Sequence, residues 1–443
     1  MTIATHSPQE VGKNTFKTLA KNHQHNLDSD YTEKIEELAK KFRYENEKSY
    51  YWSDPQFSFF YETPLYKQAS ESQKLALNHL FWNLLYKITA DSEIELTHYN
   101  LITAGTLLKM GSEYELIAKQ LEHETEQERV HIRTFYRVNY QTQKKLFGKP
   151  KKSDFAREPL SKHTPNKLLS RCIDAVNRKI LSQQGKYKSP YFLELAEKNI
   201  AFVTPTQGFF NGFQRITPLS MLQLLVQSWG SSPFLACNFY GIRYLANLNL
   251  KAYEHNVVRY YKKQQKREEV LPIPSAISYY HFLDEAFHTT TSLFIGRDLY
   301  RQVPSPSAYE KLIANIAFYL TQRENFSHLS TIVPNRFTSD RTLLPYAYQI
   351  LQSPIFGFSR EESLHWLEKC LCQEHDGLHH NLQLHHNLLN EYRHFASKLD
   401  YLWSVNREMR LMSGGGSIEK AYRKVGVAIE QNKKAFQKFA QSV

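Results

Sequence analysis

A stretch without proline, from Glu71 to Lys149, is the feature that most constrains what this chain can fold into. Apolar residues recur in it at the three- and four-residue spacing of an amphipathic helix. They are Leu75, Leu77, Leu80, Phe81, Leu84, Leu85 and Ile88. A break at Met110-Gly111-Ser112 divides the stretch. The sequence therefore predicts one long helix before this break and a second from Glu113 to about Lys145.

The rest of the chain also favours helix. Only 16 of the 443 residues are Gly and 17 are Pro, which is few for a chain built from strands and turns. Helical spacing occurs at about 240–265 and 275–302, on either side of Leu271-Pro272-Ile273-Pro274, and again after Pro306 as far as Lys398. After a glycine-rich break at 413–417, a last amphipathic helix is predicted.

We expect an all-α protein with three parts. Residues 1–70 form an N-terminal extension that combines a polar helix, at 31–42, with an aromatic stretch. Residues 71–302 form the core, which a basic, proline-containing insertion interrupts at about 146–240. Residues 303–443 form a long C-terminal helical extension.

Cysteine usage and hydropathy bear on the compartment. The cysteines are few, and Cys172, Cys237, Cys370 and Cys372 form no disulfide framework, which indicates a reducing environment. The N-terminus has no basic segment followed by an apolar run. No stretch approaches the roughly 18 apolar residues of a membrane span. We therefore expect a cytoplasmic protein that has no membrane partner.

The net charge of +12 raises the question of an acidic partner. The densest basic segments lie at 144–152 and 262–267. Solvated loops and helix ends account for most such segments, and no nucleic-acid-binding motif accompanies these two. Nucleic acid is therefore not favoured as a partner. Docking of an acidic carrier protein that bears the substrate is the alternative that stays open.

Glu and His residues on helices point to the chemistry. A Glu-x-x-His pair places both side chains on one helix face. Two such pairs, with two further inward Glu residues, form a dinuclear carboxylate site in a four-helix bundle. The sequence contains the pairs Glu95/His98, Glu128/His131, Glu285/His288, Glu362/His365 and Glu391/His394. At most two of them can belong to one such site, so the context must decide.

Residues 281–288 provide the strongest context. His281, Glu285 and His288 occupy positions i, i+4 and i+7 of a predicted helix, so they share one face. The next positions on that face are Thr289 and Ser292, which are small enough to leave room for a cluster. This stripe is a candidate source of three metal ligands.

Other helices supply the rest of the candidate set. Glu128 and His131 lie in the middle of the second long helix, and Glu254 lies on an apolar face of the helix before 281–288. A carboxylate on an apolar face is costly unless it is paired or binds a metal. The first long helix offers Glu93 or Glu95. Because the face of Glu93 is more apolar, we choose Glu93 and keep Glu95 as the alternative.

In chain order, these residues resemble the ligand pattern of the di-iron arylamine N-oxygenases. The pattern is Glu93, Glu128-x-x-His131, Glu254 and His281-x-x-x-Glu285-x-x-His288. The resemblance covers all seven iron ligands of that family, and the third His distinguishes it from ferritin-like oxygenases that have two. The segment between His131 and Glu254 and the tail after His288 are longer than in that family. The resemblance says nothing about the substrate.

The resemblance implies a ferritin-like four-helix di-iron core, to which the insertion and the C-terminal extension add helices. It implies two iron ions that use O2, through a peroxo-diferric species, to oxidise a substrate, with an amine nitrogen as the expected target. Electrons would come from an external reductase or ferredoxin, because no flavin or nicotinamide motif is present. The substrate is expected to be a small molecule or carrier-bound, and a homodimer stays open. The ligand types do not separate iron from manganese.

Two other functions stay open: a di-iron hydroxylase or desaturase that acts on a carbon substrate, and a non-enzymatic basic binding protein. The C-terminal region contains a second group of histidines, namely His375, His379, His380, His385, His386 and His394. Their spacing fits no established zinc pattern, so we interpret them as a polar helix surface.

Overall fold

The structure is a computed structural model that describes residues 8–148, 224–225, 228–326, 329–333, 340–410 and 425–443. Every regular element in these residues is a helix, which confirms the predicted all-α class. No helix in the described part is long and apolar enough to cross a membrane.

Two long helices, α5 (Glu71–Leu108) and α6 (Glu115–Leu146), form an extensive helix pair. The start of α5 is fixed by a capping box, in which Ser70 accepts from the backbone N–H of Gln73 and the Gln73 side chain accepts from that of Ser70. A short 3-10 turn, η2 (Ser112–Tyr114), separates the two helices. The predicted pair and the predicted break at 110–112 are thereby confirmed.

A second pair is formed by α11 (Pro233–Lys266) and α12 (Ile273–Arg297). Ser232 caps α11 by accepting from the backbone N–H of Leu235, and a proline follows at the start of the helix. The helix thus begins earlier than the predicted 240. The two helices approach closely at Gly241 and Gly296, where a Cβ added to Gly296 would lie 2.5 Å from the Gly241 backbone N.

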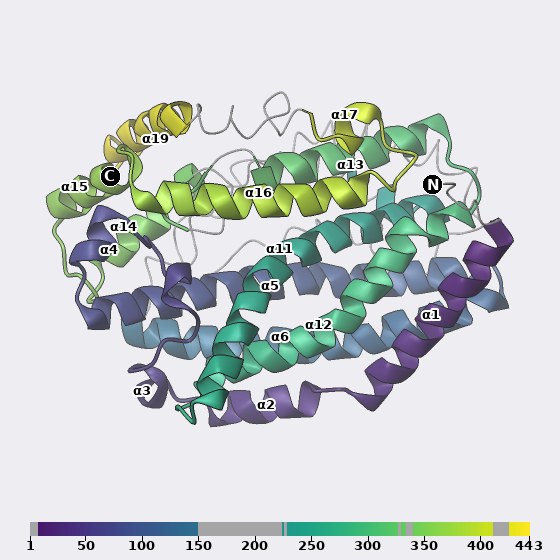
Figure 1. Ribbon diagram of the computed structural model, residues 1–443, viewed down its shortest axis with the longest axis horizontal. Coiled ribbons are helices and arrows are strands. Elements are labelled where there is room, and N and C mark those ends of the chain that lie inside the picture. The colour runs from purple at the N-terminus through teal and green to yellow at the C-terminus, as the bar shows by residue number, and fades with distance from the viewer. Residues whose placement is uncertain (1–7, 149–223, 226–227, 327–328, 334–339, 411–424) are drawn as a thin grey trace.

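The two pairs pack on each other as a four-helix core, with α11 against α5 and α12 against α6 (Figure 1). The N-terminal helices α1 (Pro8–Asp28) and α2 (Thr32–Lys41) cover α12 and α6. The polar helix predicted at 31–42 is therefore α2. The aromatic stretch after it forms the short helices α3 (Tyr44–Glu47), η1 (Pro55–Phe57) and α4 (Pro64–Gln68), with Trp52, Phe57, Phe59 and Phe60 fully buried.

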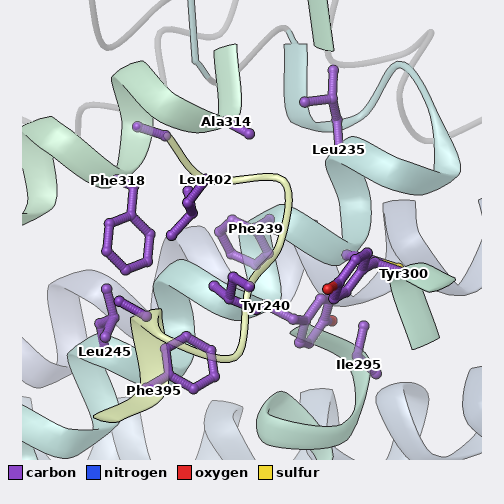
Figure 2. Packing of buried hydrophobic residues seen from close by; sticks show 14 of the residues in the cluster. Leu235, Phe239, Tyr240, Leu245, Ile295, Tyr300, Ala314, Phe318, Phe395 and Leu402 are labelled. Carbon is purple, nitrogen blue, oxygen red and sulfur yellow. The ribbon is translucent and has the colours of Figure 1, made fainter. Parts of the chain in front are cut away.

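The C-terminal region, predicted to be helical as far as Lys398, contains several separate helices. They are η5 (Leu299–Arg301), α13 (Ala308–Phe326), η6 (Asp340–Thr342), α14 (Leu344–Gln352), α15 (Arg360–Leu371), α16 (Asp376–Ala396), α17 (Ser404–Arg407) and α19 (Val425–Ala440). Of these, α13 and α16 pack on α11. Figure 2 shows this packing, in which Phe318 of α13 and Phe395 of α16 lie beside Phe239, Tyr240 and Leu245 of α11.

Apolar side chains form two separate cores along the four-helix bundle. One contains Leu121 of α6 and Ile295 of α12, and the other contains Phe135 of α6 and Ile277 of α12. The buried Glu, Asp and His residues of α6 and α12 lie between these positions in the sequence. A polar belt therefore crosses the middle of the bundle between the two apolar cores.

Most of the predicted insertion at 146–240, the glycine-rich break at 413–417 and the first part of the predicted last helix lie outside the described residues. The division of the chain into a core and two extensions stays a prediction.

Candidate metal centre

The stripe on α12 faces the interior of the bundle. His281 and His288 are fully buried, and Glu285 is 4% exposed. Glu285 Oε1 lies 2.8 Å from Nδ1 of His288 and 3.7 Å from Nε2 of His281. The helical spacing of the three residues thus places one carboxylate between two imidazoles.

The second Glu-x-x-His pair reaches the same place from α6. Glu128 and His131 are fully buried, and Glu128 Oε2 lies 3.3 Å from Nδ1 of His131. The other oxygen of Glu128, Oε1, lies 3.1 Å from Nδ1 of His288 on α12. Glu128 therefore connects the histidines of two different helices.

The remaining two predicted residues come from α5 and α11, and both contact His281. Glu93 Oε1 lies 3.3 Å from His281 Nε2, and Glu254 Oε1 lies 2.7 Å from His281 Nδ1. Glu254 also accepts a hydrogen bond from the hydroxyl of Tyr86, at 2.9 Å. The side chain of Glu95, the alternative to Glu93, lies outside what the structure describes.

Six of the seven predicted residues form two overlapping groups in which the ligand atoms lie within 4.8 Å of one another. One group contains Glu93, His131, His281 and Glu285, and the other contains Glu128, Glu285 and His288. Glu285 belongs to both. Such an arrangement can hold two cations that share a carboxylate. Glu254 is in neither group, and its carboxylate contacts Nδ1 of His281.

Neighbouring polar side chains fix the imidazole rings. His288 Nε2 lies 2.9 Å from Oε1 of Gln127, whose amide pairs with that of Asn26 on α1. His131 Nε2 lies 3.2 Å from Oδ2 of Asp284. In both rings Nε2 has a partner of its own, and Nδ1 faces Glu128. Outer partners of this kind orient metal-binding histidines.

A buried arginine joins the centre from α11. The guanidinium of Arg243 lies 3.1 Å from Oε1 of Glu128 and 2.8 Å from Oε2 of Glu124, one turn earlier on α6. Glu124 also accepts from the Gln120 side chain. All of these residues are buried. Arg243 therefore partly offsets the charge of two carboxylates that water does not reach.

The buried carboxylates and imidazoles shift one another's pKa values. Burial and the nearby Glu128 raise the pKa of Glu93 to about 7. Burial alone would raise the pKa of Glu128, but His288 and His131 hold it well below its usual range. Burial alone would lower the pKa of His131, but Asp284 and Glu128 raise it to about 9. The carboxylates thus keep protons on the imidazoles, and these are the protons that a bound metal would replace.

The donor set fits a pair of divalent cations. Six buried carboxylates, from Glu93, Glu124, Glu128, Glu254, Asp284 and Glu285, surround a single arginine and three histidines. Oε2 of Glu93 and Oε2 of Glu254 are buried without a hydrogen-bond partner. Buried carboxylate oxygens without donors are expensive, and a metal ion would satisfy them. Carboxylate and imidazole are the ligand types of iron and manganese sites.

The structure brings together all seven residues chosen from the sequence, and their role as metal ligands stays a prediction. Sequence reasoning missed Asp284, Glu124, Gln127 and Arg243. The first three lie within one turn of predicted ligands, so helical spacing could have found them. Arg243 had no such signal, because it lies on α11 and its partner Glu128 lies on a different helix, α6.

The alternative sites find no counterpart among the described residues. Both groups with close ligand atoms lie in the four-helix core, and neither includes a histidine of α16 or the Glu362/His365 pair. Glu391 and His394 are exposed. The fold and the centre define a helical protein that buries a carboxylate–imidazole site suited to two metal ions.

Comparison with known protein families identifies the family of this chain. Residues 14–440 match the model of the family described as acyl halogenase CylC-like. Because the match spans nearly the whole chain, the chain belongs to the CylC-like acyl halogenase family. No curated protein and no solved structure matched the chain. The family description is that of an enzyme, which supports the expectation that this chain is an enzyme. It gives no support to N-oxygenation in particular.

Proposed function

We propose that the protein is a di-iron enzyme that uses O2 to transfer a halogen to a carbon atom of an acyl chain. The observation that carries the proposal is the pair of overlapping ligand groups that share Glu285 in the core of the bundle. The family description names the halogen and the acyl substrate. Together they favour oxidation of a carbon substrate over a purely structural role for the cluster.

The reaction must balance with an external reductant. A C–H bond, a halide ion, O2, two electrons and three protons give a carbon–halogen bond and two molecules of water. The sequence contains no flavin or nicotinamide motif. A separate one-electron donor, such as a ferredoxin or a reductase, would therefore supply both electrons.

The residues that would hold the irons are Glu93, Glu128, His131, Glu254, His281, Glu285 and His288. When bound, the irons would activate O2 and provide the oxidising power to break the C–H bond. Asp284 and Gln127 hold the rings of His131 and His288 in place. Phe135, whose ring centroid lies 4.9 Å from that of His281, excludes water from that side.

Oxidation of an amine nitrogen is the main alternative, because the order of the seven residues resembles the arylamine N-oxygenases. Hydroxylation or desaturation of the acyl chain is a second one. The three reactions use the same centre and differ in substrate and in the need for halide. A test must therefore separate binding of metal from the choice of reaction.

The first test is metal loading. Anaerobic addition of Fe(II) is expected to leave two irons per chain, measured by metal analysis after desalting. Glu285→Ala is expected to abolish tight binding, because Glu285 belongs to both groups. The matched control is Glu391→Ala, which removes the Glu of an exposed Glu-x-x-His pair on α16. Equal iron in both variants would contradict the proposal.

The second test is the reaction. The iron-loaded protein, a chemical reductant, O2 and bromide are offered acyl chains, free or attached to a carrier protein, and in parallel an arylamine. We expect a brominated acyl product by mass spectrometry, dependent on bromide and lost in Glu285→Ala. A hydroxylated or desaturated acyl chain would show that the protein is a hydroxylase or desaturase instead of a halogenase. A nitroso or nitro product from the arylamine would show that it is an N-oxygenase.

A further inference from the structure

Four oxidisable aromatic side chains lead from the centre to the outer layer of the fold. Tyr86 lies next to the centre, with its ring centroid 5.8 Å from that of His281. From Tyr86 the centroid distances are 4.4 Å to Trp82, then 5.7 Å to Trp52, then 6.0 Å to Tyr44. Tyr86, Trp82 and Trp52 are fully buried, and Tyr44 is 8% exposed on the short helix α3.

Both ends of this chain have a proton acceptor. The Tyr86 hydroxyl donates to Oε1 of Glu254, at 2.9 Å. At the outer end, His79 Nε2 lies 2.8 Å from the backbone carbonyl of Tyr50, so this nitrogen carries the ring proton and donates. His79 Nδ1 then accepts from the hydroxyl of Tyr44, at 3.1 Å. Burial lowers the pKa of His79 to about 4, so the ring is neutral and the lone pair of Nδ1 accepts this hydrogen bond.

The two tryptophans in the middle lack such an acceptor. The indole N–H of Trp82 donates to the hydroxyl of Ser278 and that of Trp52 to the backbone carbonyl of Glu47. Both acceptors are neutral and weakly basic. A tryptophan here can lose an electron while it keeps its proton, whereas each tyrosine can lose an electron and a proton together. This order suits the movement of an electron with proton transfer only at the ends.

Other directions from Tyr86 end at rings that are much harder to oxidise. Phe135 lies 4.5 Å from Tyr86. Tyr253 lies 6.4 Å from Tyr86, but its other ring neighbours among the described residues are Phe57 and Phe81. Phenylalanine does not exchange electrons at potentials that oxidise tyrosine and tryptophan. The route through Trp82 is therefore the one that reaches the outer layer.

We propose that Tyr86, Trp82, Trp52 and Tyr44 carry oxidising equivalents out of the centre when no substrate is there to consume them. This inference rests on the proposed O2-dependent function. A centre strong enough to break an unactivated C–H bond would otherwise oxidise its own ligands. The chain is thus a protective route, and its residues are not needed for the reaction itself.

The electrons and protons balance at each step. The irons, when bound, would supply the oxidant. Tyr86 gives one electron and passes its phenolic proton along the hydrogen bond to Oε1 of Glu254, which leaves a neutral tyrosyl radical. Trp82 gives one electron to Tyr86, which takes its proton back from Glu254. Trp52 gives one electron to Trp82, and Tyr44 then gives one electron to Trp52 and its proton to His79. A small thiol or ascorbate in solution restores Tyr44 with one electron, and the proton returns from His79.

The first experiment uses iron-free protein, so that it does not depend on the proposed function. Cys237, Cys370 and Cys372 are buried, and Cys172 is replaced by Ser. A ruthenium photo-oxidant is then attached to Asn46→Cys on α3. Flash oxidation is expected to give a tyrosyl radical at Tyr86, identified by electron paramagnetic resonance as the signal that Tyr86→Phe loses.

Variants decide whether the route is the one proposed. Trp82→Phe and Tyr44→Phe are expected to lose the Tyr86 radical, and Tyr44→Phe keeps the ring so that the fold is preserved. Tyr392→Phe is the control, because it removes a buried hydroxyl in the other apolar core. Absence of a Tyr86 radical in the parent, or a full yield in Tyr44→Phe, would overturn the proposal.

The second experiment uses iron-loaded protein with O2 and no substrate. Peptide mass spectrometry is expected to show several-fold more oxidation of the segment that contains His281 in Tyr86→Phe than in Tyr392→Phe. Equal oxidation of this segment in the two variants, in protein that consumes O2, would overturn the protective role. A protein that consumes no O2 would contradict the proposed function instead, while the photochemical result would still decide the electron route.

Discussion

Arg243 pairs with two carboxylates at the centre, yet no sequence pattern pointed to it. It lies on α11 and pairs with Glu124 and Glu128 of α6. Sequence patterns found Glu128 because a Glu-x-x-His spacing is local. The partner of a buried arginine on a distant helix has no local spacing, so only the packed helices show it.

Replacement of Arg243 by Met should destabilise the metal-free protein by about 3–5 kcal/mol, because it leaves two buried carboxylates without their cation. Urea unfolding monitored by circular dichroism measures the loss. The double variant Arg243→Met/Glu124→Gln should recover part of it, because the neutral amide no longer requires a counter-charge. Additive losses in the double variant would show that Arg243 and Glu124 do not act as a pair.

His79 should make the protein sensitive to acid. Its folded-state pKa of about 4 lies below the usual histidine value of about 6.5, so the unfolded chain binds the proton more readily. The stabilisation is therefore complete above pH 6.5 and is lost as the pH falls toward 4. The full shift corresponds to about 3 kcal/mol.

Melting temperatures of His79→Gln between pH 6.5 and 4 check this expectation. The variant should show a flatter dependence on pH than the parent over this window. His394→Gln, at an exposed position of α16, should follow the parent. An unchanged slope in His79→Gln would assign the acid sensitivity to other groups.

Among the candidate ligands, helical spacing and the cost of a carboxylate on an apolar face were sufficient to select residues that the fold brings together. The same reasoning could not place Glu254 relative to the two ligand groups, because its contact with His281 depends on how α11 and α12 are rotated against each other.

At the scale of elements, periodicity predicted α5, α6 and α12 well because their ends carry strong local signals, such as the Ser70 cap and the two prolines at the start of α12. In the C-terminal region it predicted helical structure, which α13 to α16 confirm, but it did not predict the breaks between these helices. The break between α14 and α15 contains Pro354 and Gly357, whose φ is +63°, and α15 begins with a capping box at Ser359. These are local signals that amphipathic spacing alone does not include.

The close crossing of α11 and α12 gives a sharp prediction. Gly296→Ala should lower stability by about 1–3 kcal/mol, because the new Cβ would lie 2.6 Å from the Gly241 Cα and force the helices apart. Gly241→Ala is the matched control. Its Cβ would meet the Tyr401 hydroxyl at 3.6 Å, an ordinary contact, and alanine favours helix by about 1 kcal/mol. Thermal unfolding of the two variants should therefore diverge, and equal melting temperatures would contradict this account.

At the scale of the whole molecule, the centre joins helices that are distant in sequence. Because both helix pairs contribute ligands, bound iron should hold the pairs together. Fe(II) at about 100 times its dissociation constant should add about 2.7 kcal/mol to the free energy of unfolding. Anaerobic thermal unfolding should show this shift in the parent and in Glu391→Ala but not in Glu285→Ala, and a shift in Glu285→Ala would point to binding elsewhere.

The order of the ligands along the chain has a consequence for biosynthesis. Glu93, Glu128 and His131 leave the ribosome first, and Arg243, Glu254 and the α12 ligands follow only after a long intervening segment. During translation the carboxylates of α5 and α6 are therefore made before Arg243 and before the candidate ligands of α11 and α12. Arg243 emerges before α12, so it can neutralise the nascent α6 while the last ligands are still being made. Under the proposed function, the complete ligand set would therefore exist only after α12 has been made, and iron would bind as a late step.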